Sequence, residues 1–344
     1  METPLKSLGI DLPIIQAPMA GAQGPTLALA VCDAGGLGSL PCAMLTAQQM
    51  GVQLYEMRQQ AQRPYNVNFF CHTPPEPDPT REAAWRGALA PYYAEFGIEF
   101  PSAVTGPQRS PFNDAAAQVL EEFHPPVVSF HFGLPNESLL SRVRATGAFV
   151  LATATTVEEA IWLESRGVDA IIAQGLEAGG HRGMLLTEDL STQMGTFALV
   201  PQVIRAVRVP VIAAGGIADA AGVAAALSLG ACAVQVGTAY LTCSEATTST
   251  LHRAALLDPA SRHTAVTRLF SGRPARGIVN RLIRDLGAMS ELAPAFPLAS
   301  ALLAPLRGRA ESVGDTGFSP LWCGQNASGC AEIPAAELTR RLVE

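Results

Sequence analysis

The stretch VPVIAAGGIADAAGVAAALSLGACAVQVGT, residues 209–238, decides the fold class of this chain. Two short apolar runs, at 209–216 and 232–238, enclose an alanine-rich segment of helical length at 219–230. Neither run alternates apolar and polar residues, which is typical of strands buried on both faces of a parallel sheet. The segment between them begins at an aspartate and ends at a glycine, as a capped helix does. The stretch therefore predicts a strand, a helix and a second, parallel strand.

The same pattern recurs along the chain, and the segment 156–167 has helix start and stop signals of the same kind. Eight strand–helix units over about 245 residues match a (β/α)8 barrel, which typically has about 250 residues. A doubly wound open sheet is the alternative, but no G-x-G-x-x-G sequence follows the first strand. We therefore predict an α/β fold, the (β/α)8 TIM barrel. The other strand-forming runs are 13–19, 35–40, 65–70, 127–132, 149–154 and 169–175.

Two regions do not follow the repeat. We predict that residues 1–245 form the barrel, interrupted after the third strand by a proline-rich insertion at about 72–112 that carries its own helix. Residues 246–344 are predicted to form a C-terminal, mostly helical extension packed on the barrel. We expect both regions to cover the catalytic mouth of the barrel or its flank.

Composition restricts the class of partner. A chain of 344 residues with 48% hydrophobic and 15% charged residues can bury a large core. The net charge of -7, without a basic run, argues against nucleic-acid binding. Seven scattered cysteines without a C-x-x-C pair argue against a disulfide framework or a structural zinc, and no strand-end cluster predicts any other metal. Apolar stretches are too short to span a bilayer, so we expect a cytoplasmic monomer or homodimer that binds small molecules and no membrane.

The carboxyl ends of the last two predicted strands indicate a phosphate site. Active sites of TIM barrels form at these ends. One strand ends in Gly215 and Gly216, and the next in Gly237 and Thr238. Backbone N–H groups at such glycines can approach a phosphate unobstructed, and the threonine hydroxyl can add a bond. A single such turn would need glycine only for backbone freedom, but two on adjacent strands predict a phosphate-bearing cofactor.

Polar side chains follow other strands. Asn68 and Gln174 carry amides that donate and accept, which suits a heteroaromatic ring, although either could instead tie neighbouring loops together. His181 follows Gly179 and Gly180. Glycines leave the backbone unobstructed by side chains, and an imidazole has a pKa suited to proton exchange near neutral pH. A structural hydrogen bond is the alternative role for this imidazole.

Six blocks of the chain carry a family resemblance. The chain resembles the FMN-dependent nitronate monooxygenases of the class I type from residue 10 to about 245, and again at SGRPARGIVNR, residues 271–281. The resemblance implies a TIM barrel that binds FMN noncovalently and oxidises alkyl nitronates, and by extension nitroalkanes, with O2 to carbonyl compounds and nitrite. The blocks within the barrel are IIQAPMAG (14–21), YNVNFFCH (65–72), AQGLEAGGHRG (173–183), PVIAAGGI (210–217) and QVGT (235–238).

The resemblance also implies roles for single residues. His181 would face the substrate and act as the base toward neutral nitroalkanes. His131 would be a second histidine at the pocket, either assisting catalysis or supporting the structure. Residues implied to line or hold the flavin ring are Ala17, Pro18, Met19, Asn68, Gln174 and Gly179. Residues implied to hold the ribityl phosphate are Gly216, Gln235, Val236, Gly237 and Thr238.

Two other functions fit the same motifs. An NAD(P)H-dependent FMN reductase of the enoyl-reductase or quinone-reductase type shares the barrel and the glycine–histidine motif. A non-catalytic flavin-binding barrel would bind FMN without turnover. Fold alone does not choose among them.

The arginines of the 271–281 block have two interpretations. We expect Arg273, Arg276 and Arg281 to form a salt-bridged surface, and the alternative is that they neutralise an anionic substrate or phosphate. The segment 291–312 lacks the tyrosines and lysine that relatives acting on propionate 3-nitronate place around the substrate. The resemblance therefore transfers the flavin chemistry better than the identity of the substrate.

Overall fold

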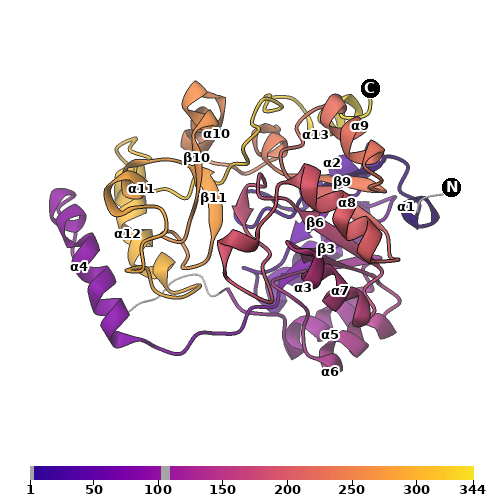
Figure 1. Ribbon diagram of the computed structural model, residues 1–344, viewed down its shortest axis with the longest axis horizontal. Coiled ribbons are helices and arrows are strands. Elements are labelled where there is room, and N and C mark those ends of the chain that lie inside the picture. Colours follow the sequence, from indigo (N-terminus) through magenta and orange to yellow (C-terminus); the bar gives the residue numbers. More distant parts are fainter. Residues whose placement is uncertain (1–3, 102–108) are drawn as a thin grey trace.

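The computed structural model describes residues 4–101 and 109–344, which form a barrel with a second lobe beside it (Figure 1). Eight parallel strands of the described chain form the barrel wall in the order β1-β9-β8-β6-β5-β4-β3-β2. A parallel bridge between Ile15 and Leu37 joins the two ends of this sheet, so the predicted TIM-barrel fold is confirmed. The strands are β1 (Ile14–Gln16), β2 (Ser39–Pro41), β3 (Asn66–Phe70), β4 (Val127–His131), β5 (Phe149–Ala154), β6 (Ala170–Gln174), β8 (Val211–Ala214) and β9 (Ala233–Val236).

Helices cover the outside of the barrel. The helices predicted at 156–167 and 219–230 are α7 (Val157–Ser165) and α9 (Ala220–Ser228), and the side chains of Thr156 and Asp219 cap them. No described helix combines the length and the apolar character needed to cross a membrane. The remaining helices of this part are α1 (Pro4–Ser7), α2 (Pro25–Asp33), α3 (Ala47–Gln60), α5 (Asp114–Phe123), α6 (Glu137–Ala145), α8 (Thr196–Ala206) and the short η1 (Leu190–Thr192) and η2 (Thr238–Thr242).

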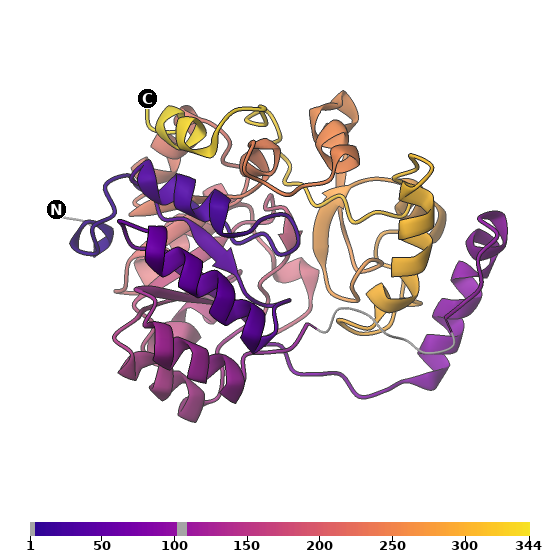
Figure 2. The ribbon, with the colours of Figure 1, turned by 180° about the vertical axis from the view of Figure 1, so that it is seen from behind.

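The end of the chain returns to the barrel. Helix α13 (Ala335–Arg341) packs against α2 between the N-terminal and C-terminal parts of the barrel (Figure 2). The hydroxyls of Tyr240 and Thr339 lie 2.8 Å apart in the core, and Leu338 is buried in the main hydrophobic cluster. The barrel therefore depends on residues about 100 positions beyond its last strand.

Alternation along the strands positions the side chains at the mouth. Successive residues of a strand point to opposite faces, so every second residue of a barrel strand points inward. In β6 the inward residues are the buried Ile172 and then Gln174, and in β5 they are Leu151 and then Thr153. The apolar members pack together in one internal cluster, which places the polar members at the carboxyl end. The same rule brings His131 of β4 to the mouth.

The second lobe contains a small antiparallel sheet. Its strand order is β10 (Thr264–Thr267), β11 (Ala275–Ile278) and β7 (Gly180–His181), and β7 belongs to the loop that follows β6. The C-terminal region was predicted as mostly helical, and the structure adds two of these strands to it. Its helices are α10 (Thr250–Leu257), α11 (Arg281–Leu286) and α12 (Ala299–Glu311), with the short η3 (Pro259–Arg262).

The helix of the insertion after β3 packs against this lobe, while the two ends of the insertion, at His72 and Arg109, lie near Phe296. Its helix α4 (Pro79–Glu95) lies beside α12, at the end of the molecule remote from the barrel (Figures 1 and 2). The Trp85 indole N–H donates to the Ala299 carbonyl oxygen at 3.2 Å, and the Tyr93 hydroxyl donates to the Leu302 carbonyl oxygen at 2.5 Å. The apolar face of α4 packs against the C-terminal helices. The order of these segments in the sequence does not reveal this contact.

Candidate active site

The loop that carries His181 is held between the barrel and the second lobe. On the lobe side, His181 pairs with Ala275 of β11. On the barrel side, the His181 carbonyl oxygen accepts from Gln174 Nε2 at 3.0 Å and from His131 Nε2 at 3.2 Å. The Gly183 N–H donates to Gln174 Oε1 at 2.8 Å. Both ends of the Gln174 amide therefore hold this loop, which is the second of the two roles open to it from sequence.

Both ring nitrogens of His131 are hydrogen-bonded, and one of them supports the same loop. Its Nε2 donates to the His181 carbonyl, and its Nδ1 lies 3.1 Å from the hydroxyl of Thr153. Burial lowers the pKa of His131 to about 3, and the nearby Arg273 and Arg182 act in the same direction. A neutral ring with both nitrogens engaged positions its neighbour, so the geometry favours structural support over catalytic assistance.

The ring of His181 lies among aromatic side chains, which we call the aromatic cluster. The ring centroids of Phe296 and Trp322 are each 5.4 Å from that of His181, and Phe132 and Phe70 follow at 5.9 and 6.3 Å. Phe70 ends β3, Phe132 follows β4 directly, and Phe296 and Trp322 come from the C-terminal lobe, so the surroundings of the histidine ring are built from three parts of the chain. Apolar walls of this kind exclude water and strengthen electrostatic interactions within a site.

His72 also belongs to the aromatic cluster, although nothing in the sequence singled it out. Its ring meets Phe296 edge-on at 4.8 Å, and it is 5% exposed. Its Nδ1 is buried without a hydrogen-bond partner among the described residues. Burial, with Arg273 nearby, lowers the pKa of His72 to about 4. Its place two residues beyond the end of β3 is the signal that could have identified it.

Two arginines make the cluster electropositive. The Arg273 guanidinium lies 4.2 Å from the ring centre of Phe132, and that of Arg109 lies 5.7 Å from Phe296. In the described part of the chain, neither has a carboxylate within salt-bridge distance, and burial lowers the pKa of both. Burial first, and then the charge of Arg109, hold the pKa of His181 well below its usual value. The imidazole is therefore neutral at physiological pH, so one of its ring nitrogens has a free lone pair.

The expected salt-bridged surface exists only at Arg281, which pairs with Glu95 at 2.6 Å. Arg276 is 5% exposed and donates to the Leu176 carbonyl oxygen at 2.9 Å, beneath the histidine loop. Arg273 faces the aromatic cluster. The surface prediction was wrong for these two arginines, because Arg276 belongs to the buried strand β11 and Arg273, in the turn before it, packs on Phe132.

The glycine turns after β8 and β9 form a cradle of free N–H groups. Gly215 and Gly216 have φ angles of +121° and +71°, which favour glycine. Across the described residues, no acceptor is bonded to the N–H groups of residues 215–218 or 237–239. Helix η2 begins after Gly237 without a side-chain cap. Such an uncapped terminus beside free N–H groups suits a phosphate.

One polar atom beside the cradle is orphaned, and as an amide oxygen it would accept from an N–H or O–H of a ligand and not from a phosphate oxygen. Gln235 Oε1, beside the cradle, is buried without a hydrogen-bond partner in the described chain. The competing helix terminus nearby, that of α8, is already occupied: the Glu177 carboxylate accepts from the Thr196 N–H at 2.8 Å. The residues present therefore fit a bound phosphate at the β8 and β9 turns and not at α8.

A segment from the far end of the sequence lies over this cradle, and sequence analysis missed it. The Gly324 N–H donates to Thr238 Oγ1 at 3.0 Å, which leaves the Thr238 hydroxyl proton free for a ligand. Asn326 Nδ2 donates to the Gly216 carbonyl oxygen at 3.1 Å. We call residues 323–330 the C-terminal strap. Its composition, CGQNASGC, is rich in small and polar residues, which is the signal that could have marked it.

The strap also explains Gly179. A Cβ at Gly179 would lie 2.5 Å from Gly324 N and 2.7 Å from the carbonyl carbon of Cys323. The close approach is therefore made by the strap, and Gly180 next to it is needed for its φ of +70°. The strap contact at Gly179 and the positive φ of Gly180 explain why glycine is required at both positions, and neither explanation involves a cofactor.

The remaining predicted residues lie at the mouth beside the cradle. The Ala17 N–H donates to the Val236 carbonyl oxygen at 2.8 Å, and the Met19 N–H donates to Gln23 Oε1 at 2.9 Å, so the 17–19 turn, which includes Pro18, is fixed next to β9. Asn68 Nδ2 donates to Ser129 Oγ at 2.9 Å, which ties β3 to β4. Contacts of these residues with a flavin ring stay predictions.

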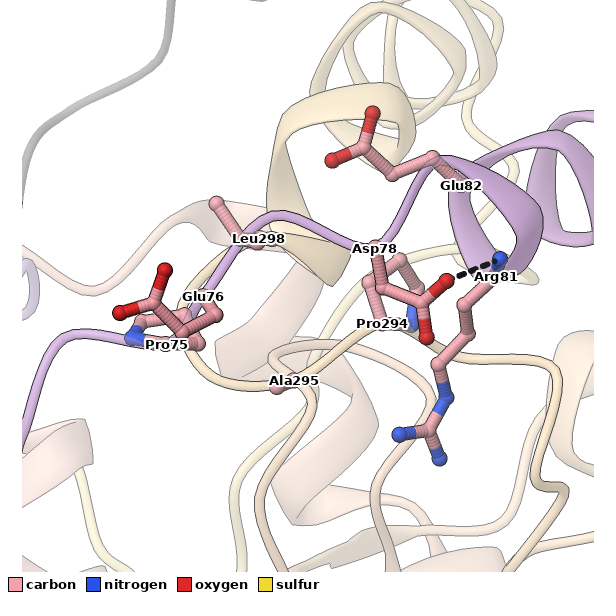
Figure 3. Close-up of a pocket in the computed structure, with 8 residues that line it drawn as sticks. All are labelled: Pro75, Glu76, Asp78, Arg81, Glu82, Pro294, Ala295 and Leu298. Atoms are coloured by element: carbon pink, nitrogen blue, oxygen red, sulfur yellow. Dashed lines mark hydrogen bonds between the residues drawn. The ribbon is translucent and has the colours of Figure 1, made fainter.

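A different pocket, of about 190 Å³, lies where the insertion meets the C-terminal lobe (Figure 3). Its lining includes the carboxylates of Glu76, Asp78 and Glu82, and the Arg81 N–H donates to Asp78 Oδ1 at 3.0 Å to start α4. Three carboxylates against one arginine disfavour an anionic substrate there. Among the described residues, no group of three or more His, Cys, Asp or Glu side chains could hold a metal ion.

Comparison with known proteins gives a consistent result. A family model described as nitronate monooxygenase matches residues 2–344. A nitronate monooxygenase of Paraburkholderia phytofirmans is 44% identical over 98% of this chain and 93% of its own length, and one of Pseudomonas aeruginosa is 44% identical over 98% and 97%. The crystal structure of a nitroalkane oxidase from Streptomyces ansochromogenes superposes with a TM-score of 0.89 at 41% identity, covering 98% of this chain and 96% of the other.

Proposed function

The chain belongs to the nitronate monooxygenase family of flavin-dependent enzymes, and from that premise we propose that it uses FMN and O2 to convert alkyl nitronates to carbonyl compounds and nitrite. The family and the enzyme class predicted from sequence are thereby confirmed. The observation that carries the proposal is the combination at one barrel mouth of the phosphate cradle with a neutral, loop-fixed His181.

FMN is the flavin that fits the cradle best. Gly215 and Gly216, together with Gly237 and Thr238, supply one set of free N–H groups and one hydroxyl, which matches one phosphate. The sequence contains no second nucleotide fingerprint that would hold the rest of a dinucleotide. When bound, the flavin supplies the capacity to accept electrons from the substrate.

The protein residues supply charge, shape and a proton acceptor. Arg109 and Arg273 favour an anionic nitronate beside the aromatic cluster, since both cations lack carboxylate partners among the described residues. The aromatic rings exclude water from the reacting centre. A nitronate arrives already deprotonated, whereas a neutral nitroalkane must first lose its α-proton, and His181 is placed to take it. We therefore propose that the enzyme accepts nitroalkanes as well.

Absorption spectroscopy tests the proposal directly. The purified protein is expected to be yellow and to release FMN on heating. Addition of a nitronate without O2 is expected to bleach the flavin, and admission of O2 to restore it with formation of nitrite. Bleaching by NADH or NADPH but not by a nitronate would replace the proposal with a nicotinamide-dependent reductase. No bleaching by either would favour a non-catalytic flavin-binding barrel, and released FAD would contradict the cofactor.

A further inference from the structure

Ser271 is the single hydrogen-bond partner of the His181 ring among the described residues. Its hydroxyl oxygen lies 2.8 Å from His181 Nε2, and the side chain is 1% exposed. The hydroxyl has one other acceptor nearby, the Arg273 carbonyl oxygen at 3.4 Å. The second ring nitrogen of His181, Nδ1, has no protein partner in the described ranges. One nitrogen is thus fixed by the serine, and the other is left for a ligand.

The position of Ser271 is set by the second lobe. The next residue, Gly272, has a φ of +92°, and a Cβ there would lie 2.2 Å from the Pro294 carbonyl oxygen. The Gly272 N–H donates to the Arg268 carbonyl oxygen at 2.7 Å. This tight turn leads directly into β11, which pairs with the histidine loop. The serine is therefore presented to the histidine by the fixed turn before β11, and the histidine by β7, which pairs with β11.

Charge around the ring decides which nitrogen carries the proton. A neutral imidazole has one N–H, and the partner of one nitrogen selects the tautomer. Arg109 and Arg273 are cations close enough to lower the pKa of the His181 ring, and a ring nitrogen that faces a cation favours a lone pair over an N–H. The Ser271 hydroxyl can then accept from Nε2–H and donate its own proton to the Arg273 carbonyl oxygen.

We propose that Ser271 is a positioning residue that accepts the Nε2–H of His181, so that Nδ1 presents its lone pair to the carbon acid. The proposal rests on the proposed function for the identity of that acid, a neutral nitroalkane. In the step, the α C–H bond breaks and the Nδ1–H bond forms. The electron pair of the broken bond delocalises into the nitro group, giving the nitronate. Ser271 continues to accept the Nε2–H of the resulting imidazolium and so keeps the ring oriented, although its neutral hydroxyl lacks the charge of a triad carboxylate.

The experiment uses the FMN-loaded enzyme with ¹⁵N-labelled histidine. Nitrogen chemical shifts distinguish the two neutral tautomers, and a His181→Gln spectrum identifies the signals of His181. We expect the Nε2–H tautomer in the wild type and a mixture of tautomers in Ser271→Ala. The matched control is Ser319→Ala, which removes another buried hydroxyl, bonded to Glu311 Oε1 at 2.6 Å in the second lobe. The control is expected to leave the His181 signals unchanged.

Kinetics supply the second readout. We expect Ser271→Ala to lower kcat/KM for nitroethane by about tenfold to a hundredfold, part of the usual value of a positioned base, with a much smaller loss for ethyl nitronate. Flavin content is verified in each variant. An Nδ1–H tautomer in the wild type, or an equal loss for both substrates, overturns the proposal.

The two proposals fail in different ways. A wild type that does not oxidise nitronate refutes the proposed function, whereas the tautomer measurement still decides whether Ser271 accepts from His181. A wild type that oxidises both substrates, combined with an unchanged ratio between them in Ser271→Ala, refutes only the role of Ser271.

Discussion

The phosphate cradle and the histidine loop lie at the same barrel mouth but are built in opposite ways. The cradle comes from two strand ends that are 22 residues apart, Gly215 and Gly237, and its glycines are placed by local turns. The histidine loop depends on β11, about 95 residues further along the chain, and on Ser271 within the same region. The comparison teaches that the glycine cradle is a property of the barrel, whereas the geometry around His181 belongs to the contact between barrel and lobe.

The largest effect is expected from a substitution in the histidine loop. In His181→Gln the side-chain amide can replace Nε2 as a donor to Ser271, while the base at Nδ1 is removed. We expect kcat/KM for a neutral nitroalkane to fall by roughly 10²–10⁴-fold, the usual contribution of a general base, with a distinctly smaller loss for the nitronate. Steady-state rates with both substrates check this. Equal losses at full flavin occupancy would assign His181 to binding.

The second-largest effect is expected from a substitution that disrupts the cradle and leaves the histidine loop intact. Gly237→Asp places a carboxylate at the expected phosphate position, where like charges about 4 Å apart repel by up to about 4 kcal/mol near a protein surface. We expect FMN affinity to fall by roughly a hundredfold, with little change in the Tm of the apo-protein. Fluorescence titration measures the affinity, and Gly308→Asp, in open space on α12, is the matched control. Unchanged affinity would place the phosphate elsewhere.

A third change tests the C-terminal strap, which touches both regions. Gly179→Ala forces a Cβ to within 2.5 Å of Gly324 N, and such overpacking costs about 1–3 kcal/mol. We expect a lower Tm and weaker FMN binding together, because the strap also bonds to Thr238. Gly87→Ala, in the middle of α4 with nothing within 4 Å, is the control and should keep or raise the Tm. A lower Tm with unchanged FMN affinity would separate the strap from the cofactor.

The smallest expected effect is a pH dependence in the lobe behind the histidine. His252 Nε2 lies 3.1 Å from the Trp322 carbonyl oxygen, and Trp322 packs on His181. Burial lowers the pKa of His252 to about 4, so the unfolded chain binds more protons than the folded one between about pH 6.5 and pH 4. The free energy of unfolding therefore falls as the pH is lowered through this window. This residue contributes at most about 1.4 kcal/mol per pH unit to that fall.

In His252→Gln the amide can keep the bond to Trp322 but does not titrate. We expect the variant to lose part of the fall in stability between pH 6.5 and pH 5, measured by urea denaturation at each pH. An identical pH profile in both proteins would contradict the assignment. Stability at pH 8 serves as the control, because His252 is neutral there in both the folded and the unfolded state.

Much of the site could be predicted because it follows from position within a repeat. Once the strands are recognised, alternation brings His131 and Gln174 to the mouth, and the turns bring Gly215 and Gly237. Their partners could not be predicted in the same way. Nothing local to Gln174 indicates that its amide holds the backbone of His181 and Gly183, because loop conformation decides which groups it meets.

The sequence by itself determined the barrel, its family and the residues at the strand ends. Apolar runs, helix caps and glycine turns each depend on a few neighbouring residues and not on distant contacts. Only the tertiary structure decided that β7 pairs with β11, that α4 packs on α12, and that Ser271, His72 and the C-terminal strap reach the mouth. The physical reason is that these contacts satisfy backbone groups and apolar faces whose partners lie about 50 to 215 residues away, and only the folded chain chooses among the partners available.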